Sequence, residues 1–150
     1  MTKLNCKVYV ATKMIGGDKA EMVARAIRVS EILKEAGITP ISPVIEEKVK
    51  DEPGKLIKAD KDQLRRFWNR DKKILIQEAD VMLWDHAEQK SFGCEREMGF
   101  MRFCLWKPVV IYVAPGTPTS VAEFEDDSVF TSVHEAAKYI AETWGTTEKR

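Results

Sequence analysis

Short runs of apolar and β-branched residues alternate with helical patterns along this chain, and that alternation constrains the fold more than any other feature. The runs occupy residues 6–12, 39–42, 81–85 and 109–113, and turn-forming residues bound them. Strands that alternate with helices are typical of a doubly wound α/β domain. We therefore expect a mainly parallel sheet of four to five strands with helices on both faces.

Helical patterns fill the stretches between and after these strands. The first helix should begin near Asp18, where Glu21 three residues later resembles a capping box, and should end before Gly37. The others should run from about Leu64 to Glu78, from Cys94 to Leu105 and from Val133 to Trp144. At 150 residues the whole chain, 1–150, fits a single domain.

Residues 43–62 interrupt the regular alternation. They are rich in charge and contain Pro53 and Gly54, so we expect a mobile loop there. The loop either closes over a ligand or is a plain surface insertion, and the sequence leaves both interpretations open. The tail, residues 145–150, is expected to fray.

Composition excludes several classes of function. Lys and Arg number 24, as do Asp and Glu, so the basic surplus that grips nucleic acid is missing and no nucleic-acid partner is expected. Three cysteines and two histidines without a CxxC argue against a zinc site or a disulfide framework, and we expect neither metal nor cofactor. The charged N-terminus is unlike a signal peptide and no apolar run is long enough to span a membrane, which favours a soluble cytoplasmic protein.

Asp71 falls on the apolar side of the second long helix. At helical spacing it lies in the middle of a stripe formed by Leu64, Phe67, Trp68, Ile74 and Leu75. A bare buried charge is too costly, so this carboxylate must be hydrogen-bonded, paired or turned toward a ligand. It is either tied to a backbone amide or a neighbouring Arg, or part of a site.

Glu97 borders the apolar side of the next helix, which is formed by Cys94, Met98, Met101, Cys104 and Leu105. We expect it in the first turn, where the helix dipole favours an ionised carboxylate. An ionised, partly desolvated Glu at the carboxyl end of a strand is a candidate nucleophile. The alternative is ordinary enrichment of acidic residues at a helix start. Glu95 and Arg102 share a different, more polar face.

Ligands of such sheets bind beyond the carboxyl ends of the strands, which directs attention to residues 12–18, 85–93 and 114–127. Ser91 and Gly93 precede a new helix whose N-terminus can hold an anion. The pair Gly16 and Gly17 lets a ligand approach the backbone closely. Four aromatic residues are candidates to stack on a base or to belong to the core: Phe67, Trp68, Trp84 and Phe92.

Three sequence strings together are more specific than these cues. VYVATKMIGG, NRDKKILIQEADVMLWD and SFGCEREMGF with KPVVIYV resemble the nucleoside 2-deoxyribosyltransferase family, and most closely its 2′-deoxynucleoside 5′-phosphate N-hydrolase branch, over about residues 7–113. The resemblance implies a flavodoxin-like, Rossmann-like fold and cleavage of an N-glycosidic bond.

The same resemblance implies roles for individual residues. Glu97 would attack C1′ of the sugar, Asp71 would serve as acid, base or orienting group, and Tyr9 would position the nucleophile. Ser91, Gly16 and Gly17, with Gly93 in the same motif, would surround a 5′-phosphate. The transferase branch usually has Asp where Ser91 stands, and an Asp would repel a phosphate.

The expected activity is therefore hydrolysis of a (2′-deoxy)nucleoside 5′-monophosphate through a covalent glycosyl-Glu97 intermediate. A deoxyribosyltransferase that exchanges bases and a nucleotide-binding module without turnover remain alternatives. The family's members assemble as dimers or larger oligomers. Phe100, Phe103 and Trp106 exceed what one inward helix face needs, so we expect a homodimer packed partly through this helix, the alternative being a helix buried on both sides within one subunit.

Overall fold

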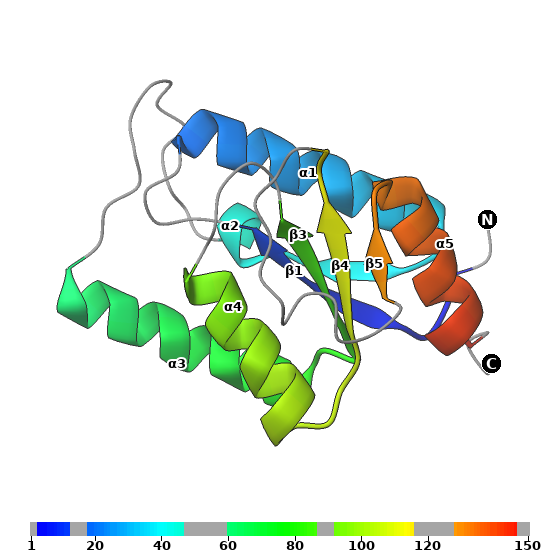
Figure 1. Ribbon diagram of the computed structural model, residues 1–150. Coiled ribbons are helices and arrows are strands. Elements are labelled where there is room, and N and C mark those ends of the chain that lie inside the picture. Colours follow the sequence, from blue (N-terminus) through cyan, green and yellow to red (C-terminus); the bar gives the residue numbers. More distant parts are fainter. Residues whose placement is uncertain (1–2, 13–17, 47–59, 87–91, 116–127, 147–150) are drawn as a thin grey trace.

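A five-stranded parallel sheet forms the centre of the molecule (Figure 1). The computed structural model describes residues 3–12, 18–46, 60–86, 92–115 and 128–146. Within these residues the strand order is β2-β1-β3-β4-β5. The strands are β1 (Lys7–Thr12), β2 (Thr39–Ile41), β3 (Val81–His86), β4 (Val109–Val113) and β5 (Val129–Phe130). The expected mainly parallel α/β fold is confirmed.

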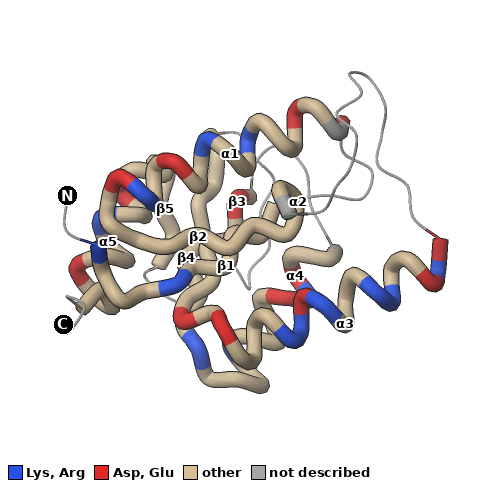
Figure 2. Tube along the Cα trace, turned by 180° about the vertical axis from the view of Figure 1, so that it is seen from behind, with Lys and Arg blue, Asp and Glu red and all other residues tan. Residues whose placement is uncertain are grey.

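Helices cover both faces of the sheet. Helices α1 (Lys19–Glu35) and α5 (Val133–Trp144) lie together on one face, whereas α3 (Lys61–Gln77) and α4 (Phe92–Gly99) lie on the other (Figure 1). The view from behind shows the same two layers (Figure 2). Helix α2 (Pro43–Glu46) is a single turn beside α1. No described helix combines the length and the apolar character that crossing a bilayer requires.

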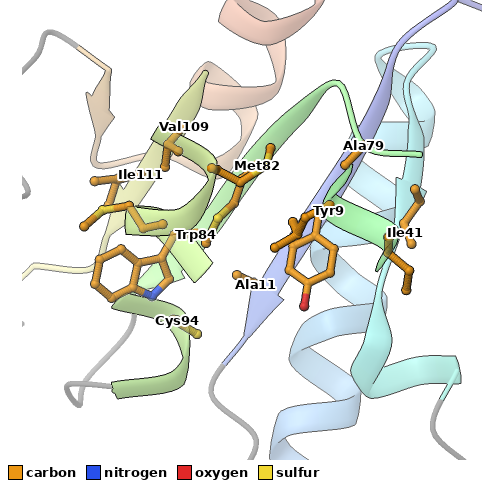
Figure 3. Packing of buried hydrophobic residues seen from close by; sticks show 13 residues of the cluster. Tyr9, Ala11, Ile41, Ala79, Met82, Trp84, Cys94, Val109 and Ile111 are labelled. Carbon is orange, nitrogen blue, oxygen red and sulfur yellow. The ribbon is translucent and has the colours of Figure 1, made fainter. Parts of the chain in front are cut away.

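The alternation of side chains along β1 builds two separate cores. Val8 and Val10 pack with residues of α1 and α5, while Tyr9 and Ala11 pack with residues of α3 and α4. All four are buried, because a strand covered on both faces has no solvent side. Figure 3 shows the second of these cores, with Tyr9 of β1 and Trp84 of β3 on the same face of the sheet. Residues Tyr9 and Asp71 can therefore meet only on the α3 side.

The segment expected to be a loop, residues 43–62, is partly helical. Its first residues form α2, because Pro43 is pre-set for the first position of a helix. Its last residues begin α3, where Asp60 accepts from the Gln63 amide and the Gln63 side chain returns a bond to the Asp60 amide. Residues 47–59 lie outside the described part, so mobility there stays a prediction. The tail at 147–150 lies outside it too.

The sequence pattern predicts a regular α-helix as far as Leu105, but α4 ends at Gly99. Residues Phe100–Cys104 form a π-helical turn, and the Leu105 amide donates to the Phe100 carbonyl at 3.0 Å. The wider turn rotates the following side chains relative to an α-helix. Met101 stays buried, but Cys104 is exposed, so its predicted place on the apolar side is wrong.

Lys107 joins the end of this turn to the end of α3. Its ammonium donates to the backbone carbonyls of Leu75 at 2.7 Å, Ile76 at 3.0 Å and Ala79 at 2.8 Å. These carbonyls lie at the C-terminus of α3, where the helix leaves acceptors without intrahelical donors. The preceding residue, Trp106, has φ 54°, a left-handed conformation that is unusual for a bulky residue.

The strand order reverses direction between β1 and β3. The chain leaves β1 through α1 to β2 on one side, and reaches β3 through α3 on the other. The carboxyl ends of the two strands are adjacent, with Thr12 opposite Asp85. In open α/β sheets, ligands bind in the crevice beyond the carboxyl ends of the strands, at the point where the strand order reverses. Asp85 points to the α1 face, where Arg25 Nε and Nη2 donate to its two oxygens at 2.6 and 2.7 Å.

Candidate active site

Tyr9, Asp71 and Glu97 meet between the sheet, α3 and α4. Tyr9 is the third residue of β1 and its side chain is buried against the α3 and α4 face (Figure 3). Asp71 belongs to α3 and Glu97 to α4, and each is only 8% exposed. The Tyr9 hydroxyl hydrogen-bonds with both carboxyls. The structure thus brings together the three residues for which the resemblance implies catalytic roles.

Asp71 is held from two sides. The Arg70 guanidinium donates from Nε to Asp71 Oδ1 at 2.9 Å, and the Tyr9 hydroxyl bonds to the same carboxyl. Burial raises the pKa of Asp71, whereas the bond and charge of Arg70 and the bond to Tyr9 act in the opposite direction. The two interpretations of Asp71 are therefore not exclusive: it is tied to a neighbouring Arg and it faces the buried phenol.

Glu97 is the more strongly perturbed carboxyl. Burial first, and the nearby charge of Asp71 second, raise its pKa to about 8, against the opposing effects of the Tyr9 bond and of Arg70. Its Oε2 atom is buried and has no hydrogen-bond partner among the described residues. Glu97 thus has one carboxyl oxygen without a partner among the described residues, and its raised pKa favours the protonated form at neutral pH.

The predicted reason for an ionised Glu97 is wrong. Helix α4 begins at Phe92, so Glu97 is its sixth residue and Glu95, rather than Glu97, lies in the first turn. The helix dipole fades within the first turn and contributes about 1 kcal/mol at most at exposed sites. Desolvation of this buried carboxyl outweighs it and raises the pKa of Glu97, which favours the protonated form in the free protein.

Tyr9 itself stays neutral. Burial, then the charge of Glu97, raises the pKa of its hydroxyl well above the usual value. Cys94, one turn before Glu97 on α4, is buried in the same core and also raises the pKa of Tyr9. The phenol therefore acts as a hydrogen-bonding group between the two carboxyls rather than as a charged group.

The aromatic candidates for base stacking divide into two groups. Trp84 is fully buried and stacks on His86 with ring centroids 4.5 Å apart, so it belongs to the core. Phe67 and Trp68 are half-buried, and they lie beneath Arg70 and Arg96 respectively at 5.3 and 5.2 Å. The Phe92 side chain lies outside the described residues.

Of the four predicted anion-binding residues, the structure describes only Gly93. Gly16, Gly17 and Ser91 lie outside the described residues, as do most of the loops 12–18, 85–93 and 114–127. Gly93 is the exposed second residue of α4. Across the described ranges, no group of three or more His, Cys, Asp and Glu side chains is arranged to hold a metal ion.

Two features of the site differ from what the sequence pattern predicts. The predicted place of Leu64 on the inward stripe of α3 is wrong: Leu64 is 44% exposed, and the buried residues of α3 begin only at Asp71. Arg70 was not singled out as a site residue, although it pairs with Asp71. Its only sequence signal is that it directly precedes Asp71 in the string NRDKK.

The arrangement suits chemistry that needs a nucleophile and an acid together. Two carboxyls that share one phenol cannot both ionise easily, so one keeps a proton while the other is charged. A carboxylate oxygen can attack a carbon that develops positive charge, and a neutral carboxylic acid can protonate a leaving group.

Solved structures of other proteins have the same fold. A 2-deoxyribosyltransferase from Bacillus psychrosaccharolyticus, described as a biocatalyst for nucleoside synthesis, superposes with a TM-score of 0.66 at 17% sequence identity, over 89% of this chain and 92% of that one. A conserved protein from Enterococcus faecalis V583 superposes with a TM-score of 0.61 at 12% identity, over 91% of this chain and 98% of that one. No protein-family model and no curated protein sequence matches this chain. These likenesses show that the architecture is shared with a nucleoside-processing enzyme.

Proposed function

We propose that this chain hydrolyses the N-glycosidic bond of a (2′-deoxy)nucleoside 5′-monophosphate and releases the free base and the sugar phosphate. The observation that carries the proposal is the burial of Glu97 and Asp71 around the single hydroxyl of Tyr9. The shared fold with a 2-deoxyribosyltransferase supports a reaction at the same type of bond.

Glu97 is the proposed nucleophile. Its carboxylate attacks C1′, the bond from C1′ to the base nitrogen breaks, and the base leaves with a proton from Asp71. A glycosyl ester on Glu97 results. Asp71, now ionised, accepts a proton from a water molecule whose oxygen attacks C1′, and the ester bond breaks to regenerate Glu97. Tyr9 fixes the position of Glu97 through its hydrogen bond.

The proposed preference for a nucleotide rests on Ser91, Gly16 and Gly17, with Gly93 in the same motif. In this proposal the Ser91 hydroxyl and the backbone amides of these glycines donate hydrogen bonds to the phosphate without repelling its charge. The electrostatic contrast with the transferase branch, which usually has Asp at the position of Ser91, supports a charged 5′ group.

Incubation with a panel of deoxynucleoside and ribonucleoside monophosphates, and with the matching nucleosides, tests the proposal. Free base is measured by chromatography, with and without an added acceptor base. Free base from the monophosphates without an acceptor, at far higher rates than from the nucleosides, is the expected result. Equal or faster release from the nucleosides would contradict the nucleotide preference.

A second candidate function is transfer of the deoxyribosyl group to another base. The shared fold with a 2-deoxyribosyltransferase over 89% of the chain favours it. In that reaction an incoming base, rather than water, attacks the glycosyl ester on Glu97. Base exchange that depends on the acceptor identifies this activity, whereas tight binding of nucleotides without any product identifies a non-catalytic binding module.

We also propose that two copies of the chain associate. Phe103 and Trp106 are 61% and 86% exposed and follow α4 closely. Phe100, the third residue expected to be surplus, is half-buried and packs against the core. Large apolar side chains that a single copy leaves so exposed often mark an interface. A homodimer packed partly through the residues after α4 would cover them.

A further inference from the structure

Arg70 is fixed at the edge of the site by two contacts. Its Nε donates to Asp71 Oδ1 at 2.9 Å, and its guanidinium lies over the Phe67 ring at 5.3 Å from the centroid. Its side chain is 28% exposed, compared with 12% for that of Asp71. Contact with a carboxylate on one side and a ring face on the other leaves the guanidinium little freedom to turn away.

The Tyr9 hydroxyl limits where protons can be in the site. A hydroxyl has one hydrogen to donate, but Tyr9 hydrogen-bonds with the carboxyls of both Asp71 and Glu97. It can donate to one carboxyl and accept from the other only if the second carboxyl is protonated. Two bonds to one phenol therefore favour a single proton shared by the two acids.

The described groups that face this pair decide which acid holds the proton. They are Tyr9 from β1, Arg70 from α3 and Cys94 from α4, while His86 of β3 lies on the same sheet face stacked on Trp84. Arg70 is the cation of this set, and it contacts Asp71 directly. Glu97 receives only the more distant effect of the Arg70 charge.

We infer that Arg70 is a positioning residue that holds Asp71 in its ionised form and thereby keeps the shared proton on the Glu97 side of Tyr9. The importance of this role for catalysis rests on the proposed function, but the experiment that tests the role does not. The effects of Arg70 on the two acids agree with this role. Arg70 lowers the pKa of Asp71 through both a hydrogen bond and its charge, whereas it lowers the pKa of Glu97 through its charge alone.

This starting position explains how both catalytic forms arise from one proton. Glu97 passes its proton to the Tyr9 oxygen, and Tyr9 passes its own proton to Asp71. The result is an ionised nucleophile and a neutral acid, with no proton gained or lost. Positive charge that develops on the sugar favours this transfer, because it stabilises an ionised Glu97 more than a neutral one.

Carbon-13 NMR titration of the side-chain carboxyls in the protein without substrate tests the inference. Spectra of Glu97→Gln and Asp71→Asn assign the two resonances. In the wild type Asp71 should ionise at lower pH than Glu97. In Arg70→Met the pKa of Asp71 should rise by roughly 1 unit, and the two carboxyls should titrate closer together. Arg66→Met is the matched control, because it removes an exposed Arg one turn earlier on α3 and should move neither resonance.

An Asp71 titration that is unchanged in Arg70→Met would overturn the inference. If Arg70→Met does not fold, Arg70→Gln retains a polar side chain and decides in the same way, by a rise or no rise in the pKa of Asp71. The titration needs no turnover, so it stands even if no base is released from any substrate. Conversely, base release with an unchanged titration would leave the proposed function in place and remove this role of Arg70.

Discussion

Asp71 and Glu97 approach the same phenol from different helices, and the charge of Asp71 raises the pKa of Glu97. Burial alone makes each carboxyl harder to ionise, and their proximity makes the second ionisation harder than the first. The two acids therefore titrate as a coupled pair, whose protons come off in two separate steps.

Glu97→Gln should reduce base release by about 10³-fold or more, because an amide cannot attack C1′. The overall fold should persist, since Gln has nearly the same shape. Glu95→Gln is the matched control on the same helix, and it should keep activity near that of the wild type because Glu95 has no role in the proposed reaction. Initial rates of base release by chromatography measure both. Turnover by Glu97→Gln close to wild type would remove Glu97 as nucleophile.

The pH dependence of kcat/KM should be bell-shaped. The reactive pair holds one proton, so activity should fall as pH rises through about 8, where Glu97 and Asp71 lose the last proton they share. It should fall on the acid side as both become protonated. Initial rates between pH 4 and pH 10 at low substrate concentration measure this profile. A rate that still rises above pH 9 would mean that the doubly ionised pair is the reactive form.

Glu97 should also make stability depend on pH. Its pKa is raised from 4.5 in the unfolded chain to about 8 in the fold. The native state therefore binds more protons between these values, and the free energy of unfolding falls as pH rises through the window, by up to about 5 kcal/mol if the group acted alone. Below pH 4.5 both states are protonated and Glu97 contributes no such loss.

Urea unfolding of the wild type and of Glu97→Gln at pH 5 and pH 8.5 measures this effect. The stability of Glu97→Gln relative to the wild type should be higher at pH 8.5 than at pH 5, because Gln removes the charge that burial opposes. Glu95→Gln should show no such difference. The same relative stability of Glu97→Gln at both pH values would contradict the raised pKa of Glu97.

Lys107→Met should destabilise the fold by about 1–3 kcal/mol, because it leaves carbonyls at the end of α3 without their donor. Lys138→Met is a control for the loss of a lysine, since Lys138 pairs with Glu142 only at the surface, at 3.9 Å. Its effect should stay within about 0.5 kcal/mol. Equal effects of the two substitutions in chemical denaturation would show that Lys107 does not anchor α3.

The proposed homodimer should dissociate in the double variant Phe103→Ser with Trp106→Asn. Asn tolerates the left-handed conformation of residue 106, so the backbone there need not change. Static light scattering at tens of micromolar measures the mass. Ile27→Ser, an equally simple loss of an exposed apolar side chain on α1, should leave the dimer intact. A monomer mass for the unmodified chain, with full activity, would refute the dimer.

The positions of the main strands and of Asp71 follow from local sequence patterns. The apolar runs that became β1, β3 and β4 need only their own residues to be recognised, and a carboxylate within the apolar stripe of α3 is visible from helical spacing. The short strand β5 escapes such analysis, because two residues carry no period and Val129 pairs with β4 only in the folded sheet.

Other features depend on contacts between segments that are distant in the chain. The bonds from Lys107 to α3 join residues about 30 positions apart, so they have no local signature. The π-helical turn after Gly99 has none either, because the pattern there is that of an ordinary helix. The pKa of Glu97 was expected to be lowered by the helix start, but its direction is set by burial, which only the packed structure reveals. Gly16, Gly17 and Ser91 remain predictions.

The ion pair of Arg25 and Asp85 has a consequence for how β3 finds its place in the sheet. Successive residues of a strand face opposite sides, so a slip of β3 by one position would send Asp85 to the side of Tyr9 and carry Trp84 toward α1. Asp85 would then be buried among apolar residues, away from Arg25, whose guanidinium now satisfies both of its oxygens. A neutral residue at this position would tolerate the slipped alignment far better. One charged pair on the face opposite the site therefore penalises a sheet in which β3 is out of register by one residue.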